Sequence, residues 1–357
     1  MSPMDIVEGV PVKPVSENDV PIKITHGWSI YTKRPINDHP THVDQPSSGL
    51  PDSHYSQLQW EDAPNNRRYI VEGTGIEGGM STVYKGWDRK FERLVAVKVA
   101  NFDTSGLPQD EVYYAHIEAM VMAKLSPACP YIVEVYDFVN NKDNKPITIM
   151  EYLDPSKYSI LQDMVDNKHK FKVQDVITIV QQLKEAYDAI HAKGLSYHDL
   201  KLGNVFYDEV NKITKLSDFG LEPINKDRPD DLRFGTLSTA PPEMIHGGRL
   251  DEVAEVYSLA TVTYELLTGK LPLHWDPENT HKFTDGYGND PQDEKDLAEK
   301  FDHTTAMALK ELFMKGMSVE RKNRIQTIHE YSDELISILQ NCKRRSILSK
   351  VQQLFKR

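Results

Sequence analysis

The chain has 357 residues, of which 39% are hydrophobic and 9% aromatic, so a sizeable core and two lobes or domains with extensions are expected. The formal net charge of −12 disfavours general nucleic-acid binding, which requires a basic face. The two cysteines, Cys129 and Cys342, indicate no disulfide framework. The sequence shows neither a run of about 18 apolar residues, as a transmembrane helix requires, nor a signal peptide pattern. We therefore expect a cytoplasmic protein.

The first 65 residues differ in composition from the rest of the chain. Residues 1–65 hold nine of the 21 prolines, and no helical or strand period persists in them. This composition predicts a mostly extended or disordered leader. Two roles stay open for it: a plain linker, or a segment that docks on a partner or on the following domain.

Regular structure is predicted to begin near Arg68. Short β-branched and aromatic runs at 69–71 and 82–84 predict strands, and the stretch 73–81 between them is rich in glycine. The backbone N–H groups of a glycine-rich hairpin can approach phosphates without Cβ clashes, although glycines also form ordinary turns.

A lysine lies inside the next predicted strand. The apolar run 94–99 predicts a buried strand that contains Lys98, whose ammonium group needs a partner because burying it alone is costly. The side chain could also reach solvent from an edge strand. Further strands are predicted at 132–136 and 147–150.

Four polar residues follow an amphipathic helix, which the spacing of apolar residues predicts over 173–192. Asp199, Lys201 and Asn204 share one short loop, and Asp218 comes 14 residues after Asn204. Such a set suits phosphoryl transfer: a carboxylate for a hydroxyl proton, a cation for the γ-phosphate, and an amide and a carboxylate for metal ions.

The D-x-K-x-x-N sequence followed by D-F-G resembles the catalytic and metal-binding loops of protein kinases. The earlier G-G-M-S-x-V-Y sequence looks most like bacterial-type Ser/Thr protein kinases. By this resemblance Asp199 is the catalytic base, Lys201 contacts the γ-phosphate, and Asn204 and Asp218 hold Mg²⁺. The Asp-Leu-Lys sequence at 199–201 is that of a Ser/Thr kinase rather than a tyrosine kinase.

The same resemblance implies the residues that bind ATP. Lys98 would bind the α- and β-phosphates and pair with Glu118 on the next helix. Met150 would be the gatekeeper, and the Glu151 carbonyl and the Leu153 amide would bond the adenine edge. The other residues expected at the nucleotide are Ile76, Glu77, Gly78, Gly79, Met80, Ser81, Val83, Ala96 and Phe206.

The activation segment departs from the family pattern. His198 stands where many protein kinases carry an Arg that grips a phosphorylated residue, and residues 221–234 contain no Ser, Thr or Tyr. Fixed charges are supplied there by Asp227, Arg228, Asp230, Asp231 and Arg233. We therefore expect a loop that is ordered without phosphorylation.

Two carboxylates are expected to anchor the second lobe. The segment 235–243 matches in length the segment that seats a peptide in protein kinases, and its Glu243 is expected to form a buried ion pair with Arg324. Glu255 stands where the family's central helix carries Asp, and its side chain is one methylene longer.

Two charged segments remain. Residues 274–302 predict an irregular acidic loop, which is either a solvated face or an attraction for a basic substrate segment. Residues 336–357 are basic, with apolar side chains on one helical face. This tail predicts an amphipathic helix that binds an anionic membrane or an acidic partner, or folds back on the acidic core.

The sequence thus predicts an α+β protein with the two-lobed protein kinase fold. The leader would be followed by a kinase domain over 66–335, with a small β-rich lobe with one main helix (66–150), a hinge (151–154) and a larger helical lobe (155–335). ATP and Mg²⁺ would be the cofactors, and a protein Ser or Thr hydroxyl the acceptor. A catalytically inactive binding scaffold and a small-molecule kinase are the alternatives.

Overall fold

The computed structural model describes residues 55–57, 68–77, 81–100, 129–140, 146–218, 221–223, 239–245, 249–272 and 291–354. The chain forms two compact units. Of the described residues, those within 26–169 and 201–219 form the strand unit, and those within 170–200 and 220–357 form the helical unit. After the hinge expected at 151–154, residues 158–160 pair with residues 206–208 of the strand unit.

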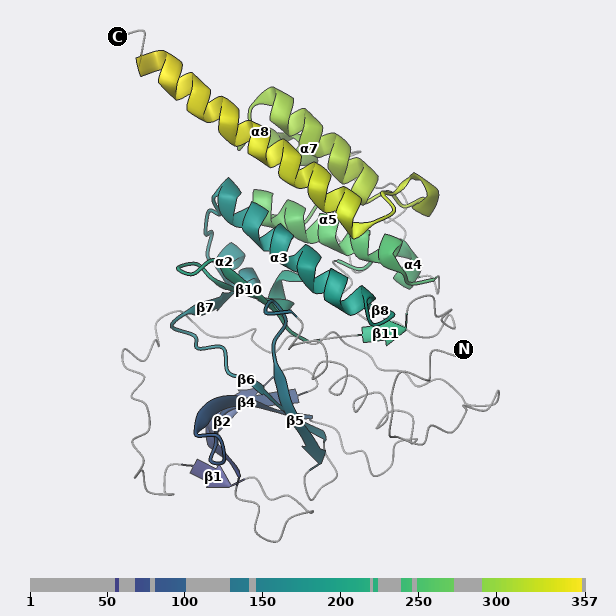
Figure 1. Cartoon of the computed structure of the whole chain (residues 1–357). Helices are drawn as coiled ribbons and strands as arrows, with labels where there is room; N and C mark the ends of the chain where they lie inside the picture. The colour runs from purple at the N-terminus through teal and green to yellow at the C-terminus, as the bar shows by residue number, and fades with distance from the viewer. Residues whose placement is uncertain are drawn as a thin grey trace. The chain divides into compact units, whose positions relative to one another are not determined.

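The strand unit is built on a sheet of six antiparallel strands, several of which are labelled in Figure 1. Their order across the sheet is β1-β2-β3-β4-β6-β5. Their bounds are β1 Tyr55–Gln57, β2 Tyr69–Glu77, β3 Ser81–Asp88, β4 Arg93–Ala100, β5 Val135–Asn140 and β6 Pro146–Glu151. Strand β1 lies within the predicted leader, and the rest of residues 1–65 lies outside the described residues.

One face of this sheet carries an apolar core. Val95 and Val97 of β4 are fully buried with Ile147 and Ile149 of β6. Successive side chains of a strand point to opposite faces, so the intervening residues lie on the other face. Burying each of these four side chains stabilises the fold by about 1.5–3 kcal/mol, which fixes the register of β4 against β6.

The glycine-rich stretch is strand rather than loop over most of its length. Strand β2 continues to Glu77, and its register against β3 shifts between Glu72 and Ile76. Gly75 has a φ of +75° and a Cβ there would lie 2.7 Å from the Thr82 side chain, so the strand requires glycine at this position. The expected hairpin tip, residues 78–80, lies outside the described residues.

A second sheet completes the strand unit, with strands β7 Tyr158–Ile160, β9 Val205–Asp208 and β10 Ile213–Leu216. Helix α2 (Leu161–Asp166) and the 3₁₀ helix η3 (Leu202–Asn204) pack against it. The strand predicted over 132–136 begins only at Val135, because Ile132 forms a parallel bridge to Leu216 instead.

The helical unit contains two short paired strands and a set of packed helices. Its elements are α3 Val173–His191, β8 Leu195–Tyr197, β11 Leu221–Pro223, α4 Pro242–Ile245, α5 Glu252–Thr268, α6 Pro291–Ala298, α7 His303–Gly316, η5 Arg321–Asn323 and α8 Ile328–Leu354. Helix α3 confirms the amphipathic helix predicted over 173–192. Helix α5 is buried along almost its whole length, packed by α3, α7 and α8.

Two predicted segments differ from the structure in this unit. Helix α6 occupies 291–298, so this part of the acidic stretch 274–302 is not irregular, whereas 273–290 lies outside the described residues. The tail boundary at residue 335 falls inside α8, the long yellow helix of Figure 1, whose Leu339 is still fully buried. Among the described helices, none combines the length and apolar character that a membrane span requires.

Candidate active site

The sheet face opposite the apolar core gathers residues expected at the nucleotide. Directly paired residues of neighbouring strands share a face, and the register pairs Ile76 with Val83, Val83 with Lys98, and Ala96 with Met150. The two-residue period of β4 places Ala96 on the same face as Lys98. Five candidate residues from four strands therefore lie on one face because of strand register alone.

Lys98 has a carboxylate partner. Its Nζ lies 2.5 Å from Oδ1 of Asp218, and this contact joins residues 120 positions apart. The two side chains are only 11% and 4% exposed, so each charge is compensated in a site with little water. The other expected partner, Glu118, lies outside the described residues, as do Gly78, Gly79 and Met80.

Backbone hydrogen bonds bring Asn204 next to Asp218. Both the N–H and the hydroxyl of Ser217 donate to the Asn204 carbonyl, at 2.9 and 3.1 Å. On the other side, Val133 N–H donates to the carbonyl of Leu216 at 2.9 Å. These bonds fix the chain on both sides of the strand end from which Asp218 projects.

The side-chain oxygens of this pair suit a hard cation. Asp218 Oδ2 is buried and accepts no hydrogen bond from the described part of the chain, and its backbone φ of +51° is unusual for a residue other than glycine. Asn204 Oδ1 is likewise buried without a hydrogen bond there, although other atoms of Asn204 are bonded. Carboxylate and amide oxygens are ligands that Mg²⁺ accepts together with phosphates, so the residues present fit this ion.

The residues expected around the adenine are buried in the strand unit. Met150, Leu153 and Phe206 are each less than 10% exposed. The side chain of Glu151 bonds to Lys215 Nζ at 2.7 Å. Sequence reasoning missed Lys215. The alternating pattern of β10 gave no indication that this lysine has a partner on β6. Ser81 is also buried, whereas Glu77 is exposed.

The two residues that are expected to have catalytic roles fall in different units. Asp199 belongs to the helical unit and Lys201, two positions later, to the strand unit, and both are buried. The backbone carbonyl of Asp199 accepts a hydrogen bond from the hydroxyl of Tyr197 at 2.9 Å. Because Tyr197 is completely buried, this bond ties Asp199 to the core of the helical unit.

Comparison with known families assigns the fold. A model of the protein kinase domain matches residues 73–345. The chain belongs to the protein kinase family. The match covers the sheet face, Asn204 and Asp218, and the two residues expected to be catalytic, so the family assignment and the geometry concern the same part of the chain.

Curated relatives of this kinase domain are bacterial. The serine/threonine-protein kinase PknL of Mycobacterium tuberculosis is 30% identical over 222 residues, which is 60% of this chain and 53% of the relative. The serine/threonine-protein kinase PknB of Mycobacterium leprae is 28% identical over 268 residues, 73% of this chain and 41% of the relative. The chain thus spans about half or less of the length of these relatives.

Glu255 keeps the contact that the family's shorter Asp would make from the central helix of the kinase domain. Its Oε1 accepts the Tyr197 N–H at 2.6 Å, and its Oε2 accepts from His191 Nε2 at 2.7 Å. Complete burial raises the pKa of Glu255, against the opposing influence of His191. Burial alone would lower the pKa of His191, but the hydrogen bond and charge of Glu255 outweigh it and raise that pKa.

Glu243 forms the ion pair predicted for the kinase domain. Arg324 donates to its two oxygens at 2.6 and 3.0 Å, and the Arg324 side chain is 0% exposed. Arg321, which sequence reasoning missed, adds a bond at 2.7 Å and binds both oxygens of Asp251. A single turn of 3₁₀ helix brings both arginines to one side.

His198, at the family's Arg position, points into the unit rather than into solvent. It is 6% exposed, and its Nε2 lies 2.6 Å from Ser196 Oγ. The activation segment from 224 to 238 lies outside the described residues. His198 is therefore held by Ser196 of β8, two positions earlier in the chain.

Proposed function

We propose that the chain transfers the γ-phosphoryl group of ATP to a Ser or Thr hydroxyl of a protein, with Mg²⁺ as the metal. The observation that carries this proposal is the contact between Lys98 and Asp218, since it joins the nucleotide face of the sheet to the metal-binding end of the catalytic segment. Membership of the protein kinase family and relatives named as Ser/Thr kinases support it.

The chain's own residues have distinct roles in the transfer. The Asp199 carboxylate accepts the proton as the acceptor oxygen bonds to the γ-phosphorus and the bond to the β–γ bridging oxygen breaks, leaving ADP. Lys98 holds the α- and β-phosphates, and Lys201 stabilises charge on the group in transfer. Asn204 and Asp218 would hold magnesium, which would supply neutralisation of phosphate charge.

The test measures transfer of labelled γ-phosphate from ATP to a generic basic protein with Mg²⁺. Asp199→Asn should lower turnover at least about a hundredfold, because the base is lost. Asp218→Asn should abolish the Mg²⁺ dependence of nucleotide binding or turnover. Wild-type activity in either variant would refute the assignment, and nucleotide binding without any transfer would indicate a binding scaffold instead.

The finer proposal is that activity does not depend on phosphorylation of the activation segment. The segment 221–234 offers no hydroxyl to phosphorylate, and His198 does not provide the permanent cation that an arginine would offer to a phosphate. Fully dephosphorylated protein should therefore turn over substrate without delay. A lag that shortens as protein concentration rises would show activation between molecules and refute this proposal.

Location and partners complete the proposal. No disulfide joins the two cysteines, both of which lie in the described part of the chain, and this suits a reducing cytoplasm. The last residues of the chain are basic, and we assign them an acidic partner or an anionic surface. Cosedimentation with vesicles containing an anionic lipid, with the tail lysines and arginines changed to glutamine as control, tests this part.

A further inference from the structure

One buried carboxylate joins three elements of the helical unit. Glu255 in the first turn of α5 holds Tyr197, the last residue of β8, and His191, the last residue of α3, through separate oxygens. Tyr197 in turn holds the Asp199 carbonyl through its hydroxyl. A continuous path of hydrogen bonds therefore runs from His191 to the backbone of the catalytic aspartate.

The two ends of this path differ in their access to solvent. Glu255 has a side chain that is 0% exposed, whereas that of His191 is 20% exposed. A proton can therefore enter or leave through His191, while the Glu255 carboxylate depends on its partners to compensate its charge. His191 also ends α3, where a cation is favoured by the helix dipole.

The charged and titratable groups around His191 come from all neighbouring elements. Helix α5 contributes Glu252 in addition to Glu255, and α3 contributes Asp188, and all three favour the protonated imidazole. Asp188 is itself paired at 2.6 Å with His329 of α8. Two tyrosines complete the surroundings: the ring of Tyr187 lies 5.8 Å from the imidazole, and Tyr197 of β8 lies 6.2 Å from Tyr187.

We propose that a proton shared by His191 and Glu255 holds the catalytic loop in place, and that His191 is therefore a positioning residue for phosphoryl transfer. The kinetic part of this inference rests on the function proposed above. The geometric part, a proton-dependent contact between α3, α5 and β8, does not.

The proton matters because it decides the strength of the central hydrogen bonds. With His191 protonated, Glu255 is a compensated anion and both of its bonds are charge-assisted, which makes them about twice as strong as neutral ones. When the proton leaves, the buried carboxylate loses its counter-charge. Turnover should then fall about fivefold as the pH rises through the pKa of His191.

The kinetic experiment compares the pH dependence of kcat from pH 5.5 to 9 in the full chain. Wild type should show a falling limb above pH 6.5, and His191→Gln, which keeps a hydrogen-bond donor without a proton to lose, should lack that limb. The matched control is His169→Gln, which removes a histidine–carboxylate pair that does not act on His191, since His169 lies 3.8 Å from Glu209, and it should keep the wild-type profile. The KM for ATP should be equal in all three proteins. A falling limb retained in His191→Gln would overturn the inference.

A second experiment works without activity. Selective ¹³C labelling of the 13 histidines allows the His191 resonance to be assigned as the one missing from His191→Gln. Its titration midpoint should fall towards 6.5 in Glu255→Gln, and exchange of the Tyr197 amide, corrected for intrinsic rate, should accelerate in that variant. If no protein phosphorylates substrate, the proposed function fails while these shifts still support the proton-dependent contact. An unchanged midpoint or an unchanged amide exchange rate overturns it even in an active enzyme.

Discussion

The ion pair between Glu243 and Arg324 offers a direct test of how the helical unit is held together. Glu243→Gln keeps the shape of the side chain and removes its charge, which leaves the fully buried guanidinium of Arg324 without its anion. Breaking a buried pair in this way costs about 3–5 kcal/mol. The lower end is expected, because Arg321 keeps both bonds to Asp251 and is 31% exposed. A loss of about 3 kcal/mol corresponds to about 6–12 °C in Tm.

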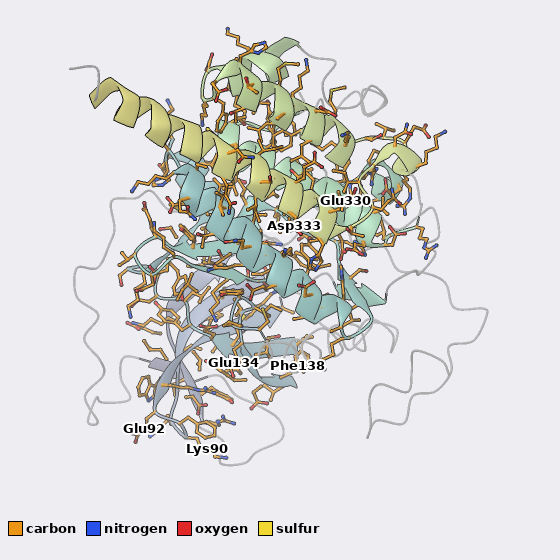
Figure 2. All side chains as sticks on the ribbon, turned by 45° about the horizontal axis from the view of Figure 1, so that its top comes forward. Lys90, Glu92, Glu134, Phe138, Glu330 and Asp333 are labelled. Atoms are coloured by element: carbon orange, nitrogen blue, oxygen red, sulfur yellow. The ribbon has the colours of Figure 1, made fainter. Side chains whose placement is uncertain are left out.

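Urea denaturation at equilibrium and thermal melting of the same samples measure this loss. The control is Lys184→Gln, since Lys184 pairs with an Asp333 side chain that is 64% exposed and labelled on α8 in Figure 2. An exposed pair contributes at most about 1 kcal/mol, so Tm should change by only a few degrees. If Glu243→Gln were as stable as Lys184→Gln, burial of the unpaired Arg324 charge would not determine the loss of unfolding free energy, and the reasoning would be wrong.

Three further outcomes are expected. Lys98→Met should weaken ATP binding at least tenfold in calorimetry, because it removes the phosphate-binding cation and leaves Asp218 buried without its partner; unchanged affinity would exclude Lys98 from the nucleotide site. The pKa of His191 is raised in the folded chain. Its pairing with Glu255 therefore stabilises the fold fully below about pH 6.5 and less as the pH rises through the raised pKa. The Tm advantage of wild type over His191→Gln should shrink from pH 6 to 9, and a constant difference would contradict this. Gly73→Ala and Gly75→Ala share the strain of a positive φ, but only the second meets a neighbouring side chain, so Gly75→Ala should be the less stable by about 1 kcal/mol or more.

Where contacts follow from local rules, the sequence predicted which candidate-site residues lie together. Strand periodicity and register alone bring Val83, Ala96 and Lys98 to one face. The fixed spacing of Asn204 and Asp218 predicted a shared role, and backbone bonds through Ser217 show why this spacing brings them close. Contacts of this kind form within one secondary-structure element or between two adjacent ones, so local sequence patterns predict them.

The residues that were missed form contacts between distant elements. Arg321 meets Glu243 across 78 positions and Lys215 meets Glu151 across 64, and no local pattern distinguishes these cations from solvated ones. Composition likewise gave no sign that α8 continues past residue 335 without a break. A change to basic composition does not end a helix, because lysine and arginine are good helix formers and the apolar positions of α8 continue to Leu339.

The departure from the family pattern at Glu255 has a structural consequence that composition alone would not suggest. A longer carboxylate side chain favours an inactive scaffold only if it displaces the contact with the catalytic loop. Here the Tyr197 N–H bond is formed at 2.6 Å and the second oxygen bonds to His191. A titratable partner therefore takes part in a contact that anchors Asp199. This makes the pH profile, rather than the presence or absence of activity, the property in which the pairing of Glu255 with His191 should be visible.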